Sequence, residues 1–182
     1  MRPIRVLAVS LCCAVSSGCV TSLQPAITER DAHFAPELVG TWTDSANTER
    51  AVITRSGARG YGIAYTDDRG ETKRFIGRLG RVGAHHVLDL ENAEPETAPG
   101  DSSGTHLALV LDTIGLRISV AVLEPDTLNA YLQAHPRAVA HRRTKDETVL
   151  TASSADLSKF LAVYLQRPGV LSDPALWIRR AP

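Results

Sequence analysis

From Leu38 to Glu124 the sequence alternates apolar with polar or small residues at a period of two. Strand side chains point alternately to the two faces of a sheet, so this spacing indicates strands that are buried on one face. Turn signals separate the runs, and one of them, Asp67-Asp68-Arg69-Gly70, ends on a glycine that is free to adopt positive φ. The pattern predicts a series of short antiparallel strands. The runs are 51–54, 61–65, 75–79, 86–90, 107–111 and 116–122.

Four glycines lie inside these strands, at Gly60, Gly62, Gly77 and Gly80. Glycine weakens a flat strand but permits bends and close backbone approach. We therefore expect one antiparallel, strongly coiled sheet or a barrel.

Two short helices are predicted in the C-terminal half. Residues 125–134 begin with a proline, which suits a first helical turn, and place apolar residues on one stripe. Ser153 and Asp156 have the spacing of a capping box before a second apolar stripe, which ends at Arg167-Pro168-Gly169. Residues 175–180 are predicted to form a last strand. The fold class expected is mainly β, or α+β, in a single domain.

The N-terminus has the order of an export signal. Arg2 and Arg5 precede an apolar stretch at 6–15 and the small residues of 16–18. The apolar stretch has about ten residues, whereas a spanning helix needs roughly 20, so a transmembrane anchor is not expected.

The stretch Val15-Ser16-Ser17-Gly18-Cys19 resembles the lipobox of bacterial lipoproteins. The resemblance implies that residues 1–18 are a signal peptide, removed before Cys19, and that Cys19 carries lipid. Val20 stands where an aspartate would signal inner-membrane retention in some bacteria, so the expected place is the outer membrane, facing the periplasm. Two alternatives remain open: an ordinary signal peptide cut nearby, and a cytosolic protein with an apolar first helix.

Removal of residues 1–18 and lipidation of Cys19 would determine which cysteine chemistry remains available to the processed chain. Removing 18 of the 182 residues leaves 164, with Cys19 as the last cysteine, since Cys12 and Cys13 lie in the removed part. A lipidated Cys19 leaves no thiol for a disulfide, a metal site or a nucleophile. The processed chain has a net charge near −2, which argues against nucleic acid as a partner. We expect 19–36 to be a flexible tether and 37–182 to be one β-rich domain.

Gly40-x-Trp42, at the head of the strands, resembles the opening of lipocalin-like (calycin) barrels. The resemblance implies that Trp42 closes one end of a barrel beneath a ligand cavity. The chain also resembles small uncharacterised bacterial lipoproteins, which gives a fold expectation and no activity. The segments that carry this second resemblance are His86-Val-Leu-Asp-Leu, 107–123 and Val149-Leu-Thr-Ala-Ser-Ser-Ala-Asp-Leu-Ser-Lys-Phe.

Three functions follow as hypotheses. The first is a non-catalytic module that is held at the membrane by its lipid and contacts another envelope protein. The second is a binder of a small apolar or amphiphilic ligand, which requires a cavity of several hundred Å³. The third is a hydrolase. The residues expected to line a ligand site are Trp42, Tyr61, Tyr65, Phe75 and Arg78.

Few residues suggest catalysis or metal binding. His85 and His86 are neighbours on a strand, so they point to opposite faces and cannot easily share one ion. Ser102 or Ser103 could form a hydrolytic trio with His106 and Asp112, but no nucleophile elbow accompanies them. We therefore predict no catalytic residue, no metal and no cofactor.

Overall fold

The structure, a computed structural model, describes residues 20–93, 104–143 and 147–181. These residues form eleven strands, two α-helices and one 3-10 helix. In chain order they are β1 (Thr21–Ser22), η1 (Pro36–Leu38), β2 (Gly40–Asp44), β3 (Arg50–Ser56), β4 (Gly60–Thr66), β5 (Thr72–Val82), β6 (His85–Asn92), β7 (His106–Asp112), β8 (Arg117–Val122), α1 (Pro125–Ala134), β9 (His141–Arg143), β10 (Thr148–Leu150), α2 (Ser154–Tyr164) and β11 (Ala175–Arg180).

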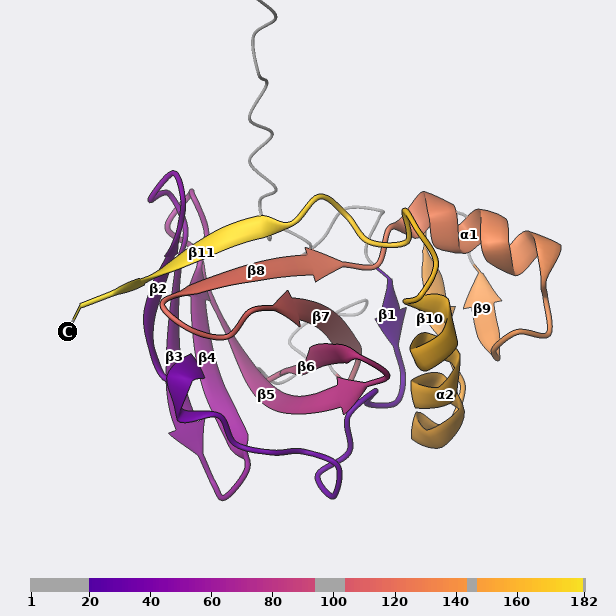
Figure 1. Ribbon diagram of the computed structural model, residues 1–182, viewed down its shortest axis with the longest axis horizontal. Coiled ribbons are helices and arrows are strands. Elements are labelled where there is room, and N and C mark those ends of the chain that lie inside the picture. The colour runs from indigo at the N-terminus through magenta and orange to yellow at the C-terminus, as the bar shows by residue number, and fades with distance from the viewer. Residues whose placement is uncertain (1–19, 94–103, 144–146, 182) are drawn as a thin grey trace, which may run out of the picture.

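Eight of the strands close into an antiparallel barrel (Figure 1). Strands β2 to β7 each pair with the next strand along the chain, and β11 closes the circle between β8 and β2. Trp177 of β11 accordingly lies opposite Ile118 on one side and Asp44 on the other. Closure removes the unpaired edges that an open sheet would expose. The predicted mainly β fold with two helices in the C-terminal half is confirmed, in its barrel form.

Three further strands extend the sheet beside β7. Strand β1 pairs with the start of β7, at Ser22 and His106, and runs parallel to β10, which in turn pairs with β9. Strands β9 and β10 belong, with the two helices, to the long connection between β8 and β11. Figure 1 shows this group packed against one side of the barrel, with β3 and β4 on the other.

The fold has two apolar cores. One fills the barrel, and the other lies between the outer face of β5–β7 and the layer formed by the helices and the N-terminal segment. Val87 and Val110 face the outer core, whereas Leu88 and Leu109 face the barrel. Strands buried on both faces have near-continuous apolar sequences, and β6 and β7 show this in Val-Leu-Asp-Leu and Leu-Ala-Leu-Val-Leu.

Both helices begin where predicted, and α2 ends at Tyr164, three residues before the predicted stop at Arg167-Pro168-Gly169. Helix α1 starts at Pro125 and ends at Ala134. Helix α2 begins after Ser153, whose hydroxyl accepts a hydrogen bond from the backbone N–H of Asp156. This bond satisfies one of the free N–H groups of the first turn, as expected from the capping spacing.

The predicted tether is wrong for residues 20–36. Val20, Ala26, Ile27 and Ala32 are buried in the outer core, so this segment is part of the fold. Ile27 packs directly on Gly80, where a Cβ atom would lie only 2.6 Å from two of its carbons. The segment looks polar in sequence because its buried apolar residues are few and are separated by polar residues, most of which are exposed or partly exposed.

Candidate functional site

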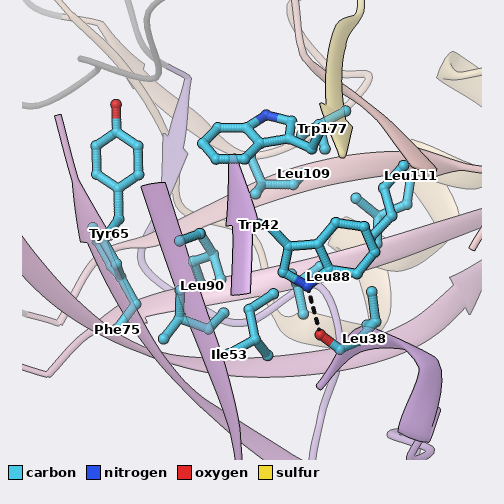
Figure 2. A pocket seen from close by; sticks show the side chains of 14 residues that line it. Leu38, Trp42, Ile53, Tyr65, Phe75, Leu88, Leu90, Leu109, Leu111 and Trp177 are labelled. Atoms are coloured by element: carbon cyan, nitrogen blue, oxygen red, sulfur yellow. Dashed lines mark hydrogen bonds between the residues drawn. The ribbon is translucent and has the colours of Figure 1, made fainter. Parts of the chain in front are cut away.

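The barrel interior contains a narrow apolar cavity (Figure 2). The space that water-sized groups can occupy is about 60 Å³, compared with the several hundred Å³ of an ordinary small-molecule site. A water-sized group needs about 10–15 Å³ by this measure, so about four to six such groups fit. The lining is almost entirely hydrocarbon and aromatic. It consists of Leu38, Trp42, Ala51, Ile53, Ile63, Tyr65, Phe75, Leu88, Leu90, Leu109, Leu111, Ile118, Val120 and Trp177.

One end of the barrel is closed by the chain that leads into β2. The indole Nε1–H of Trp42 donates to the carbonyl oxygen of Leu38 at 2.9 Å. The hydroxyl of Tyr61 accepts from the backbone N–H of Ala35 at 2.7 Å, and Phe34 stacks on the Tyr61 ring at 5.3 Å between centroids. These contacts hold the buried Trp42 and Tyr61 side chains against the segment that precedes β2.

Aromatic side chains border the opposite end of the cavity. The rings of Tyr65 and Trp177 lie 6.3 Å apart, and Figure 2 shows both on the side of the cavity away from Leu38. Phe75 is half-buried near this end. The cavity is thus bounded by aromatic rings and has a hydrocarbon middle.

The structure brings together four of the five residues predicted to bind a ligand. Trp42, Tyr65 and Phe75 line the cavity, and Tyr61 belongs to the same core cluster. Arg78 does not join them.

Arg78 lies on the outer face of β5, because Phe75, Gly77 and Leu79 are the positions that face inward. Its Nη1 is 3.1 Å from Oε2 of Glu91 on β6. The expectation that Arg78 lines the ligand site is therefore wrong, since its guanidinium is in an ion pair outside the barrel.

Trp177 is a lining residue that sequence reasoning did not select. It lies in the predicted last strand, at an inward position of the period-two pattern. Trp177 could have been predicted to line the cavity if this strand had been known to close the barrel, but a single sequence does not show the order of the strands in the sheet.

The hydrolytic trio is not assembled. Asp112 lies six residues from His106 on the same strand, a separation of about 20 Å. Ser102 and Ser103 lie outside the described residues. The described part of the chain contains no group of three or more His, Cys, Asp or Glu side chains arranged to hold a metal ion.

His106 instead forms a buried pair with Asp89. Its Nδ1 is 2.7 Å from Oδ1 of Asp89, and the other carboxyl oxygen accepts from the backbone N–H of Ala26 at 2.6 Å. Asp89 has no exposed surface and faces the outer core. The pair connects two barrel strands to the N-terminal segment and is separated from the cavity by the barrel wall.

A second histidine, His86, lies with Arg81 and His33 where β5 meets β6. Nη1 of Arg81 is 3.3 Å from Nε2 of His86, and the rings of His33 and His86 are 6.0 Å apart. Burial lowers the pKa of His86, and the nearby Arg81 and His33 lower it further. The Arg81 guanidinium can only donate, so the contact favours the neutral imidazole.

Acidification is expected to destabilise the fold through His86. Its pKa in the unfolded chain is about 6.5, so below that pH the unfolded state binds a proton that the folded state resists. Stability is then lost as the pH falls from 7 toward the lowered pKa of the folded state. Urea unfolding of the wild type and of His86→Gln between pH 7.5 and 5 measures this effect, and the variant should show the weaker pH dependence. Identical pH profiles would contradict the assignment.

Comparisons with protein-family models, with curated proteins and with solved structures found no match. None of the helices in the described ranges is long and apolar enough to cross a membrane. The function is therefore argued from the residues and geometry above.

Proposed function

We propose that this chain is a bacterial lipoprotein whose folded body is held at the periplasmic face of the outer membrane by lipid on Cys19. The proposal is supported by the lipobox-like stretch Val15-Ser16-Ser17-Gly18-Cys19 and by the charged and apolar residues that precede it in the order of an export signal. Cys19 and the proposed signal peptide, residues 1–18, lie outside the described residues.

The body acts, in this proposal, as a non-catalytic module that contacts another envelope protein. The observation that carries this part is the small size of the interior cavity, since about 60 Å³ is well below the volume of a ligand-storing barrel. With little room for a ligand inside, the outer surface is the part of the barrel that is available for contacts. Val163 on α2 and Leu116 before β8 are apolar and largely exposed, which makes them the first positions for a photo-crosslinking amino acid in intact cells. An adduct with an envelope protein at either position supports the contact, and monomer alone at both contradicts it.

The anchor has a direct test in Cys19→Ser. Without the thiol there is no acceptor for diacylglycerol, so the variant should leave the membrane fraction or persist as uncut precursor. It should also lose incorporation of labelled palmitate. Cell fractionation with immunoblotting and palmitate labelling measure both outcomes, with Ser17→Ala as the matched control that keeps the cysteine. Unchanged membrane association of Cys19→Ser would overturn the proposal.

A second function, binding of a narrow apolar ligand, is favoured by the wholly apolar lining. Four to six methylene-sized groups fit, which corresponds to the end of a hydrocarbon chain with its polar head left outside. Trp42 and Trp177 both line the cavity and are the only tryptophans of the chain, so entry of a ligand should change the intrinsic fluorescence.

Filling the cavity tests this second function. Ala51 lines the cavity, and Ala64 on the neighbouring strand faces the outside of the barrel. Ala51→Leu should weaken binding of decanoate at least about ten-fold, because the added carbons occupy the space of the chain. Ala64→Leu, which adds the same atoms outside, should bind like the wild type. Titrations followed by tryptophan emission and native mass spectrometry measure the difference, and a wild type that does not respond to decanoate would exclude the site for this class of ligand.

A further inference from the structure

No flexible residues separate Cys19 from the folded part of the chain, which begins with the buried Val20. Val20 is buried, with 7% of its surface exposed, and the next residue, Thr21, is already paired with Val149 of β10. Consecutive Cα atoms are 3.8 Å apart, so Cys19 starts within one residue spacing of the packed core. Lipid on Cys19 can therefore reach a bilayer only if the bilayer lies next to this part of the surface, or if β1 detaches.

Two arginines lie close to this point. Val149 pairs with Thr21 on one side and with Arg142 of β9 on the other, and Thr148 pairs with Arg143. Two strand spacings place Arg142 about 10 Å from Thr21. Both arginine side chains are exposed, and as neighbours on β9 they extend from opposite faces of this outermost strand. Figure 1 shows β1, β10 and β9 on the side of the barrel that carries the helices.

Among the described residues, the acid nearest to this point in the register is Glu147. Its Oε1 accepts a hydrogen bond from the hydroxyl of Thr21, so its charge lies beside the exit of the chain. Within the described residues of β1, β9 and β10 and of Glu147 beside them, the two arginine charges outweigh this single carboxylate.

We propose that the edge formed by β1, β10 and β9 faces the membrane and that Arg142 and Arg143 contact anionic lipid headgroups. The proposal rests on the lipid anchor at Cys19 proposed above. Attraction to anionic lipid falls off within a Debye length of about 8–10 Å, so only charges that the anchor holds near the surface contribute. Charge alone does not show which face contacts the membrane, because Arg50 and Arg74 are exposed on the far side of the barrel. The position of Val20 shows it, because Val20 lies next to the lipid-bearing Cys19.

The test uses the single thiol of the processed chain, residues 19–182, which contains every described residue. Cys19 is coupled to a maleimide lipid in phosphatidylcholine vesicles that contain or lack phosphatidylglycerol. Arginines are then modified with phenylglyoxal, and the rate at each position is measured by mass spectrometry. We expect modification of Arg142 and Arg143 to slow by about five-fold or more on vesicles with phosphatidylglycerol, the effect of about one unit charge near an anionic surface. Arg50 and Arg74 should change less than about two-fold under the same conditions, because they lie beyond the screening length.

A matched control moves the anchor. In Cys19→Ser/Ser56→Cys the thiol lies at the end of β3, which is exposed and distant from β9. Coupling through this residue should leave Arg142 and Arg143 as reactive as in the uncoupled protein. Equal protection from both anchor positions would overturn the proposal.

Two other outcomes also overturn it. Absence of protection at Arg142 and Arg143 would mean that β1 detaches and the body stands away from the bilayer. Protection that increases with the density of protein on the vesicle and is the same with and without phosphatidylglycerol would show that the β9 edge contacts a second copy of the chain. Maleimide coupling supplies the anchor chemically, so none of these results depends on lipidation in cells. The anchor itself is tested independently, by the cell fractionation of Cys19→Ser described above.

Discussion

His106→Ala is expected to lower the free energy of unfolding by about 3 kcal/mol, because it removes the side chain that pairs with a fully buried carboxylate. Asp89 would retain only the backbone N–H of Ala26 as a partner within the described residues. A buried charge that loses a partner costs more than the pair itself contributes. Urea unfolding followed by circular dichroism measures the loss.

Two further variants distinguish the stability lost with the His106–Asp89 pair from the stability lost by shortening the side chain. His106→Asn retains an N–H group close to the position of Nδ1, so it should recover a large part of the stability. Asp89→Ala/His106→Ala should cost less than the sum of the two single variants, since the second change removes the stranded charge. Strict additivity of the two changes would contradict the pairing.

Loss of the pair should also loosen the N-terminal segment. The Asp89 carboxylate binds Ala26 directly, so amide hydrogen exchange in residues 20–33 should accelerate in His106→Ala more than exchange in β3 and β4. Uniform acceleration throughout the chain would show that the pair stabilises the barrel without holding this segment in particular.

Trp42→Ala is expected to cost about 3–5 kcal/mol, the usual range for removing a large aromatic side chain from a core. Trp42 is 1% exposed, lines the cavity and donates to the carbonyl oxygen of Leu38. Its loss therefore creates a void and leaves that carbonyl without its indole donor. Chemical denaturation measures the cost.

Trp42→Phe is the informative companion because it keeps an aromatic ring and removes only the N–H and part of the volume. Its cost should be roughly half that of the alanine variant, near 2 kcal/mol. An alanine variant that loses less than about 1 kcal/mol would show that the closed end of the barrel is not tightly packed. In that case the narrow cavity would be easily enlarged, which would favour the ligand-binding function over the contact function.

The local elements could be predicted because their signals are local. Alternation at 61–65 places the inward side chains of β4, and the glycine of Asp67-Asp68-Arg69-Gly70 adopts φ 83 in the turn that follows. Pro125 and Ser153 mark the starts of the helices through chemistry within one turn. Each of these choices depends on neighbours a few residues away.

The buried pair had a partial signal in the sequence. Asp89 interrupts the apolar run Val87-Leu88-Asp89-Leu90, and a carboxylate inside a strand buried on both faces needs a partner. The partner is 17 residues away in sequence and reaches Asp89 only because β6 and β7 pair. No property of the run itself points to His106.

The sequence alone was sufficient for most of the barrel strands, the Asp67–Gly70 turn, the starts of both helices and the inward positions of Tyr61, Tyr65 and Phe75, since periodicity and capping act over short distances. It did not predict the short strands β1, β9 and β10. Only the tertiary structure decided that β11 closes a barrel, that residues 20–36 pack on it and that its cavity holds about 60 Å³. It also decided that Arg78 faces outward to Glu91. These features depend on strand order and on how side-chain volumes fill a closed space, and both are set by contacts between residues far apart in the chain.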